Sequence, residues 1–565
     1  MKFPCTRYSP FPPIALEWER LEALAVVQAQ RPNRPLSLLA SALALGLACG
    51  LAGCQRQAGN QSLSANRNQL VVASKNRIDT VDPAGAYTFG AMQLLSAIGD
   101  PLYAIAPGGQ IQPKLAVALP QVSADGLTVR VALRQGVRFH DGTPFNAAAM
   151  VFTLQRFLAI GKLSYLLGDR VQSVGATGPY TLELRLKRPF AAMAPLLSAV
   201  NLTPLSPTAY RNHANRFLND RFVGTGPYRL TFFSDQQQRL EPFAGYWGKP
   251  PANGGINLVA LSNSTALFGA LTSGEVDVLL STSLEIDQQA ALHRSALGHK
   301  LREGQGPALE IGYLSLLTDQ PPLQSSGLRR AIALSLDRRT ISQRVTLGLR
   351  SPLRDLVPPS LVGSDPHAWP SYNPKAARAL YRQAGYCHGK RLKLPLTFRS
   401  NVPSDRLFAL TWQAQLRQDL GDCVALEVTG MEATTAYRQL GDGAFTMILL
   451  DWMGDFPDPD NYLVPLLGCD QAQGNRCVKG ASAASGSFWS QPGLEQALQR
   501  SASLSGPGRA ALLRRIQRQT AAATPYLPVW LVAPRAWAQR RVSQPHFDGS
   551  GRLLLQDLRT SGAPR

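Results

Sequence analysis

An acidic, proline-containing stretch that directly follows a short apolar run most constrains how this chain folds. Residues 445–450 (FTMILL) are apolar and short, which is typical of a strand buried on both faces. Residues 451–462 (DWMGDFPDPDNY) then hold four carboxylates, three aromatic rings and two prolines. The prolines stiffen the backbone that carries the carboxylates. Because open α/β sheets place ligand sites at the carboxyl ends of strands, this pattern predicts a binding loop.

Two other interpretations of the same stretch remain open. A solvated acidic turn has similar spacing. A cation site is a second alternative, because Asp455, Asp458 and Asp460 offer oxygen ligands. The loop nevertheless lacks the EF-hand pattern of alternating ligands closed by a glycine and a distant Glu. We therefore predict no resident metal.

The composition indicates a large folded protein of more than one domain. The chain has 565 residues, and this length exceeds what a single hydrophobic core usually covers. Its residues are 45% apolar and 17% charged, which is typical of a folded globular protein. Its net charge of +21 is spread over single and paired Lys and Arg residues, without a basic run. The sequence contains no RNP-type aromatic motif or zinc-finger spacing, so we predict no nucleic-acid partner. An anionic membrane surface is the better match for this charge.

The amino-terminal region predicts export. Two arginines, at 31 and 34, precede an uncharged apolar segment, residues 36–51, in the order of a secretory signal. Residues 51–54 (LAGC) resemble the lipobox of bacterial lipoproteins. This implies a signal peptide at residues 1–53, a lipid on Cys54 and a tether at 54–69. An uncleaved membrane anchor is the alternative. The long, partly acidic first 30 residues are explained if translation begins at Val26 or Val27.

Cleavage before Cys54 leaves four other cysteines in a compartment that permits disulfides. Cys469 and Cys477 flank a short polar loop, which suits a local bridge. Cys387 and Cys423 each precede a strand-like run, with a helix-like segment between the runs. A right-handed βαβ unit places both at the amino ends of neighbouring parallel strands, within bridging distance. Zinc is the alternative use of four cysteines, but no Cys-x-x-Cys spacing occurs.

Hydrophobic periodicity predicts an α/β protein. Residues 127–133 and 180–186 alternate apolar with polar, as half-buried antiparallel strands do, and residues 146–158 have helical spacing. In the later half, strand-like residues 392–398 and 424–428 enclose a helical segment at 404–420. Residues 373–385 (NPKAARALYRQAG) have an Asn cap, Pro at the first helical position and Gly past the end.

Several ordered motifs together resemble the peptide-type, family 5 extracytoplasmic solute-binding proteins of ABC importers, over roughly residues 70–534. The most specific is GVRFHDGTPF at residues 136–145. The others are GTGPY at 224–228, YW at 246–247, LRRAI at 328–332, LDR at 336–338, AGY at 384–386 and the acidic loop. We interpret His140 as part of a turn and not as a catalytic residue.

The resemblance implies a two-lobed α/β periplasmic-binding-protein fold with an additional inserted domain. Its implied parts are lobe I at 66–100, 203–308 and 524–565, an accessory domain at 101–202 and lobe II at 309–523. The chain is then expected to cross between lobes near Leu309 and near Thr524. It also implies the partners: a short peptide, an ABC permease with its ATPases, and the membrane through the lipid. We expect a periplasmic, lipid-anchored monomer without a cofactor.

The resemblance also implies a ligand site. Asp455 occupies the position at which peptide-binding members pair with the ligand α-ammonium, and Trp452 is expected to supply apolar or cation–π contact. Tyr87 and Phe456 complete the predicted ligand-binding set. An Arg is expected for the ligand carboxylate, but the sequence does not single one out.

Several functional alternatives remain. Many family members have Tyr-x-x-Asn-Thr where this chain has Tyr313 followed by LSLLT, and members also take nickel chelates, haem, sugars or opines. A nickel chelate is therefore the second ligand considered. A receptor that serves a sensor or chaperone is a different class of function. An enzyme is disfavoured because the chain lacks nucleophile-elbow, P-loop, zincin and dinucleotide-binding motifs.

Overall fold

The computed structural model describes residues 69–75, 77–281 and 284–560. The predicted signal peptide, the Cys54 lipidation site and nearly all of the predicted tether lie outside these residues. Within them, no helix combines the length and the apolar character needed to cross a membrane.

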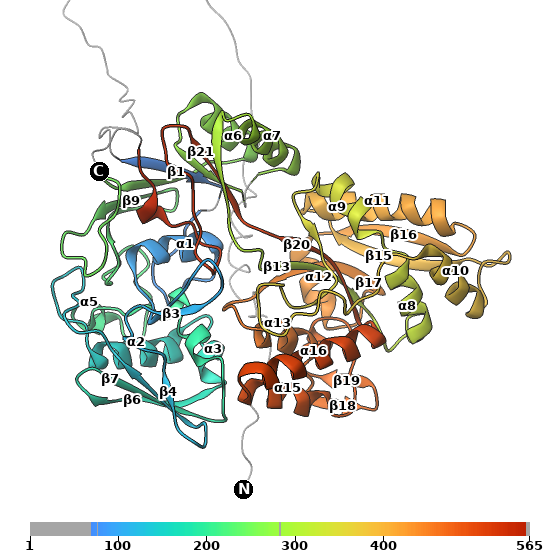
Figure 1. The fold of residues 1–565 in the computed structure, drawn as a ribbon, viewed down its shortest axis with the longest axis horizontal. Coiled ribbons are helices and arrows are strands. Elements are labelled where there is room, and N and C mark those ends of the chain that lie inside the picture. The colour runs from blue at the N-terminus through green and yellow to red at the C-terminus, as the bar shows by residue number, and fades with distance from the viewer. Residues whose placement is uncertain (1–68, 76, 282–283, 561–565) are drawn as a thin grey trace, which may run out of the picture.

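The first of two large sheets joins the beginning of the described chain to its end. Its order is β12-β21-β11-β1-β10-β9-β8, and β1 is parallel to both β10 and β11. The strands are β1 (Leu70–Ser74), β8 (Tyr228–Phe233), β9 (Gln237–Pro242), β10 (Ile256–Ala260), β11 (Val278–Leu280), β12 (Leu301–Gln305) and β21 (Arg535–Gln539). Helices α1 (Phe89–Ile98), α6 (Ser264–Ser273) and α7 (Ile286–Leu297) accompany this sheet, which lies at the upper left of Figure 1.

The second large sheet lies on the other side of the molecule (Figure 1) and has the order β14-β20-β13-β17-β15-β16. The predicted βαβ unit is confirmed, because β15 and β16 are parallel neighbours joined by α11. The strands are β13 (Glu310–Leu316), β14 (Ser351–Pro352), β15 (Leu392–Arg399), β16 (Val424–Met431), β17 (Met447–Met453) and β20 (Tyr526–Val532).

Helices surround the second sheet. The predicted capping of one is confirmed: the Asn373 side chain accepts from the backbone N–H of Ala376, and Pro374 opens the helix. The longer helices are α8 (Ser326–Leu334), α9 (Arg338–Thr346), α10 (Pro374–Gln383), α11 (Pro403–Leu420), α12 (Ala433–Leu440), α13 (Asp460–Leu467), α15 (Leu494–Ser503) and α16 (Gly506–Ala523).

A smaller domain is inserted after α1 and lies below the first sheet in Figure 1. Its antiparallel sheet has the order β4-β5-β7-β6 and packs against α2 (Ala147–Ile160), with α3 (Tyr165–Gly168) beside it. The two predicted alternating strands are neighbours, with Val129 opposite Leu184. The strands are β4 (Gln121–Val122), β5 (Thr128–Ala132), β6 (Val171–Gly178) and β7 (Thr181–Leu186).

His140 has a structural role, as its turn position predicted. Its Nε2 lies 3.0 Å from the carbonyl oxygen of Gly226, and the Gly224 N–H donates to its Nδ1. A Cβ on Gly226 would lie 2.3 Å from the Ile98 backbone, so only glycine fits there. The HDG motif at 140–142 and the GTGP motif at 224–227 therefore stabilise each other's conformation through these contacts.

The chain crosses between the two large sheets twice. The first crossing, between β12 and β13, agrees with the expected position near Leu309. The second was expected near Thr524, but β20 still pairs with β13, so the crossing lies at Ala533 and Pro534. The apolar run after Thr524 completes the core of the second sheet before the chain leaves it. The Gly306 N–H donates to the Pro534 oxygen over 2.8 Å, which ties the two crossings together.

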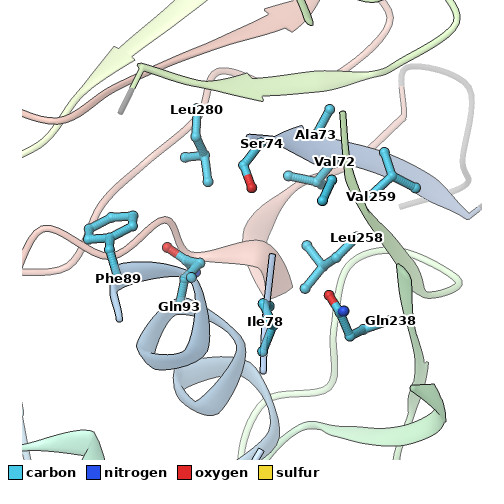
Figure 2. A pocket seen from close by; sticks show the side chains of 12 residues that line it. Val72, Ala73, Ser74, Ile78, Phe89, Gln93, Gln238, Leu258, Val259 and Leu280 are labelled. Carbon is cyan, nitrogen blue, oxygen red and sulfur yellow. The ribbon is translucent and has the colours of Figure 1, made fainter. Parts of the chain in front are cut away.

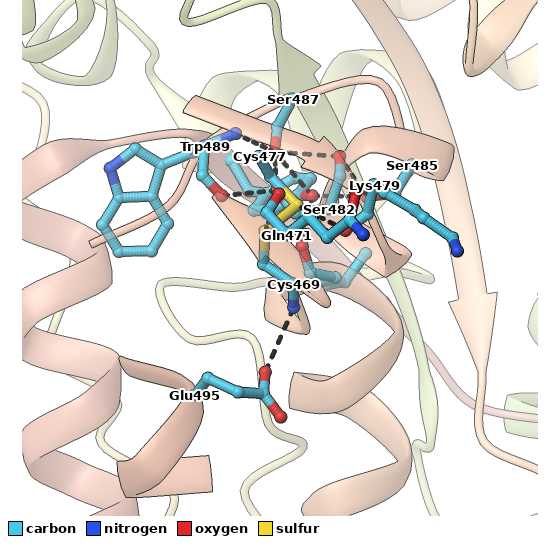
Figure 3. Close-up of a disulfide and its surroundings, with 11 residues drawn as sticks. Cys469, Gln471, Cys477, Lys479, Ser482, Ser485, Ser487, Trp489 and Glu495 are labelled. Atoms are coloured by element: carbon cyan, nitrogen blue, oxygen red, sulfur yellow. Dashed lines mark hydrogen bonds between the residues drawn. A yellow bond between two sulfur atoms is a disulfide. The ribbon is translucent and has the colours of Figure 1, made fainter. Parts of the chain in front are cut away.

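Both disulfides have the favoured pairing. Cys387 bridges Cys423 beside the start of β15 and β16, and Cys469 bridges Cys477 across the hairpin β18 (Gln471–Gln473) and β19 (Arg476–Lys479) (Figure 3). Among the described residues, one group of possible metal ligands gathers, namely Cys387, Asp422 and Cys423. Its two sulfurs are bonded to each other, so they offer no thiolate to zinc.

Candidate functional site

The predicted binding loop begins three residues later than the sequence indicated. Strand β17 continues through Met453 because Asp451 and Trp452 pair with Gly312 and Ile311 of β13. The loop that connects β17 to α13 therefore runs over residues 454–459. The four acidic residues of the stretch 451–462 have different surroundings, which decide what each can do.

Asp451 belongs to an ion-pair network inside the second half of the molecule. Both of its oxygens accept from Arg399, each over 2.8 Å. The Nε of Arg399 donates to Asp405 over 2.7 Å. One guanidinium is therefore shared by two carboxylates, and the side chain of Asp451 is still 36% exposed.

Asp458 and Asp460 are structural residues. Arg509 of α16 donates to both oxygens of Asp458, over 2.6 and 2.8 Å, and its Nη2 lies 3.3 Å from Asp460. Both carboxylates are almost fully buried. This arrangement contradicts the solvated-turn interpretation for these two residues. It also leaves both carboxylates paired with one guanidinium rather than arranged around a metal cation.

Asp455 is the acidic residue of the loop that remains without a cationic partner among the described residues. Its Oδ2 accepts from the Tyr165 hydroxyl of α3 over 3.3 Å. Burial raises the pKa of Asp455, while the Tyr165 hydrogen bond and the nearby Arg170 oppose that rise. Asn461 is a second side-chain donor to this carboxylate, and a carboxylate with two neutral donors can still accept a further, charged donor.

The three predicted aromatic ligand residues have different positions. Trp452 is half-buried, and its indole N–H donates to the Asn461 carbonyl over 2.6 Å. Because this donor is already used, a ligand could contact only the faces of the ring. Tyr87 is 50% exposed and carries the Lys162 ammonium 4.4 Å above its ring centre. Neither position conflicts with a role in binding.

Phe456 requires a correction. It is 2% exposed and packs inside the core of the inserted domain, with its ring centre 6.4 Å from that of Phe190. Arg170 covers both rings. The sequence predicted ligand contact for Phe456 because it follows Asp455. In the structure its ring packs against the inserted domain and joins the binding loop to it. We therefore assign Phe456 to that contact.

A cavity of about 370 Å³ lies between the two halves of the molecule, next to both crossings. Lys75, Phe89 and Arg535 line it from the first half. Its other wall includes Glu310 and Arg350, together with Asn401 and the amino end of α11, and Met453 at the end of β17. Clefts between domains are common solute sites, and this volume suits a small molecule.

Arg350 is the functional candidate that the sequence did not reveal. Its guanidinium lies over the Trp530 ring at 4.9 Å, and in the described residues no carboxylate lies within ion-pair distance of it. It follows α9 without a local motif, so only the fold brings it to the cleft. A cation held on an aromatic face in a cleft can receive a ligand carboxylate.

Glu310 adds an acid to the same wall. Burial, and then the nearby Asp451, raise the pKa of Glu310 to about 7, while Arg350 opposes the rise. Burial likewise raises the pKa of Asp405 to about 6. Asp405 and Asp451 share the guanidinium of Arg399, whereas Arg350 acts on Glu310 without forming an ion pair with it.

A second gap, between α1 and the first sheet, is too small for a solute (Figure 2). It measures about 20 Å³ and is lined by side chains such as Ser74, Gln93 and Gln238. This volume accommodates about one water molecule.

Residues 110–474 match the family described as bacterial extracellular solute-binding proteins, family 5, middle region. The glutathione-binding protein GsiB of Escherichia coli O1:K1 / APEC is 29% identical over 409 residues, which cover 70% of this chain and 77% of that protein. GsiB of Salmonella typhimurium (strain LT2) is 29% identical over 433 residues, covering 75% and 80%.

Solved structures share the fold. NikA from Brucella suis in complex with Fe(III)-EDTA has a TM-score of 0.76 and 22% identity, over 87% of this chain and 99% of that one. HbpA2 from Haemophilus parasuis has a TM-score of 0.75 and 21% identity, over 87% and 100%. The dipeptide-binding protein from Pseudoalteromonas sp. SM9913 in complex with Met-Leu has a TM-score of 0.69 and 22% identity, over 87% and 100%. At these identities the likeness establishes the two-lobed fold.

Proposed function

The chain belongs to family 5 of the bacterial extracellular solute-binding proteins, and from this membership we propose that it captures short peptides between its lobes and delivers them to an ABC permease. Family 5 proteins bind peptides or small solutes and hand them to such permeases. In our proposal the protein performs no chemistry on its ligand. Lipid on Cys54 tethers it to the membrane, and the lobes close on the ligand by turning at the two crossings.

The state of Asp455 carries the peptide assignment. Arg399 or Arg509 forms an ion pair with each of the other three acids of the stretch, whereas the hydrogen-bond donors to the Asp455 carboxylate, Tyr165 and Asn461, are neutral. A buried carboxylate is stable when a cation completes it. The α-ammonium of a peptide is such a cation, and we assign Asp455 to it. Trp452 and Tyr87 are the proposed aromatic neighbours.

Arg350 is the proposed partner of the ligand carboxylate. It lines the cleft without an ion pair in the described chain, and the amino end of α11 faces the same cavity. Backbone N–H groups at a helix amino end favour a negative group. Asp455 is not among the residues that line this cavity, so in our proposal the ligand extends from Arg350 in the cleft to Asp455 in the binding loop.

The relatives give this proposal specific candidates. The names of the sequence relatives include glutathione, and one structural neighbour holds the dipeptide Met-Leu. Both ligands carry a free ammonium and a free carboxylate. Another neighbour holds Fe(III)-EDTA, a metal chelate rich in carboxylates. A metal chelate is therefore the alternative ligand that native mass spectrometry could identify.

Native mass spectrometry of the mature protein purified from its own cell envelope tests the proposal. We expect short peptides to be released on denaturation. Calorimetry with Ala-Ala, its N-acetylated form and its C-terminal amide then tests the two charges, and each blocked form should bind at least tenfold more weakly. Release of one non-peptide molecule or a metal chelate, without affinity for any peptide, would overturn the peptide assignment.

A further inference from the structure

A second cavity, of about 240 Å³, lies inside the second lobe next to the cleft. Met453 lines both cavities, so they meet at the end of β17. This cavity is smaller than the 300–1,000 Å³ typical of a whole ligand. It therefore suits one part of a molecule whose remainder lies in the cleft.

The walls of this cavity are mainly aromatic and aliphatic. Tyr313, Tyr437 and Trp452 contribute rings, and Leu440 and Pro465 contribute apolar surface. The indole N–H of Trp452 already donates to Asn461, so the tryptophan presents a π face rather than a donor. Such faces attract cations as well as apolar groups.

Asp451 supplies the charge in this cavity. Each of its oxygens accepts one bond from Arg399, and the side chain is 36% exposed. An ionised carboxylate has about four acceptor positions, so two bonds leave capacity for further donors.

The network behind Asp451 lacks one positive charge. Arg399 is paired with both Asp405 and Asp451, which leaves this triad with a net charge of −1. Arg350 and Glu310 line the adjoining cleft, and neither forms an ion pair with this triad among the described residues. Burial first, and then Asp451, raise the pKa of Asp405 to about 6, while the ion pair with Arg399 opposes that rise.

Hydrogen bonds hold one part of the cavity wall in place. Ser485 lines it, and its hydroxyl hydrogen-bonds that of Tyr526. Ser487 donates to the same tyrosine, whose ring packs edge-on against Tyr313. The Cys469–Cys477 disulfide lies beside this serine segment (Figure 3). A preformed pocket costs little ordering when a side chain enters.

We propose that this cavity is a subsite for the cationic side chain of a lysine or arginine in the bound peptide, with the aromatic rings around its methylene stem and Asp451 at its charged end. The inference rests on the proposed function and specifies its ligand class: short peptides that contain a basic residue. Cysteine, the thiol residue of glutathione, has no stem to fill the cavity and no cation for Asp451.

Matched peptides test the subsite without altering the protein. Calorimetry would compare Ala-Lys with Ala-norleucine and Ala-Arg with Ala-citrulline, and then the same pairs in reversed order. Norleucine keeps the four side-chain carbons of lysine and lacks its ammonium group, and citrulline keeps the length of arginine and removes its charge. We expect the cationic peptide to bind at least tenfold more tightly in one of the two orders. Equal affinities within every pair would overturn the subsite, and absence of binding to any dipeptide would instead overturn the peptide function.

A variant localises the effect. In Asp451→Asn the preference for lysine over norleucine should fall to near one, whereas Asp442→Asn, an exposed acid in the turn before β17, should keep the full preference. If Asp451→Asn folds and retains the preference, the assignment of Asp451 is wrong. If it fails to fold because Arg399 loses a partner, the peptide pairs on the unaltered protein still decide the proposal.

Discussion

The Tyr165 hydroxyl, from the inserted domain, donates to the Oδ2 of Asp455 across a distance of 3.3 Å. Phe456, the next residue, packs inside the core of the same domain. The binding loop leaves the second lobe and is held on its far side by the inserted domain. The proposed ammonium site is thus built from both parts, and its geometry depends on how they are placed relative to each other.

Asp455→Ala should weaken binding of a dipeptide by about 2 to 5 kcal/mol, because the ligand ammonium would be desolvated without a partner. Isothermal calorimetry measures the loss. Asp442→Ala, an exposed acid near the start of β17, is the matched control and should leave affinity unchanged. A loss of only a few tenths of a kcal/mol at Asp455 would remove this residue from the site.

Arg509→Met should lower the free energy of unfolding by roughly 3 to 5 kcal/mol, because Asp458 and Asp460 would remain buried without their cation. Urea denaturation followed by circular dichroism measures this. Arg515→Met, on the exposed face of the same helix, should change stability by less than about 0.5 kcal/mol. Equal effects of the two substitutions would show that the ion pair is not a structural element.

Glu310→Gln should change how stability depends on pH. The pKa of Glu310 is raised from 4.5 to about 7 in the folded protein by burial and then by Asp451. Between these values the folded state keeps a proton that the unfolded state releases, so this residue makes stability fall as pH rises. From pH 5 to pH 8, the variant should gain roughly 1 to 3 kcal/mol relative to the unaltered protein.

Urea denaturation at several pH values measures the Glu310 effect as a difference between the two proteins. Buried acids that do not interact with Glu310, such as Asp355, contribute equally to both proteins and cancel. Glu427→Gln is the control, because its side chain is 52% exposed and it should keep the original pH dependence. Parallel pH profiles for Glu310→Gln and the unaltered protein would contradict the prediction.

Removing the Cys387–Cys423 bridge by replacing both cysteines with serine should destabilise the protein more than removing the Cys469–Cys477 bridge. The two bridges close loops with sequence separations of 36 and 8. Loop-closure entropy then predicts losses of about 4 and about 2.5 kcal/mol. Denaturation of both double variants under non-reducing conditions measures the order. The reverse order would mean that native packing, and not the unfolded chain, sets the contribution of each bridge.

Local patterns allowed much of the fold to be predicted. Alternation identified β5 and β7, and capping residues located α10. The βαβ arrangement of Cys387 and Cys423 predicted their bridge. These features succeeded because each depends on residues close in sequence, or on one right-handed connection.

The rest of the site depends on contacts between distant segments. Arg350 and Arg399 resemble any other arginine in the sequence, and only the second sheet brings Arg399 between Asp405 and Asp451. The same holds for Phe456, whose partner Phe190 belongs to another domain. The second crossing was placed too early because β20 is as apolar as a strand of either sheet, and only its pairing with β13 assigns it.

The bond between Gly306 and Pro534 limits what kind of motion the lobes can make. Proline fixes one torsion of the shorter crossing, and the hydrogen bond couples that crossing to the other. We expect two crossings that are coupled in this way to favour rotation of the lobes about one axis over sliding. The lobes should therefore open and close by a hinge rotation. In our proposal, the permease then has to distinguish only two forms of the protein, one open and one closed.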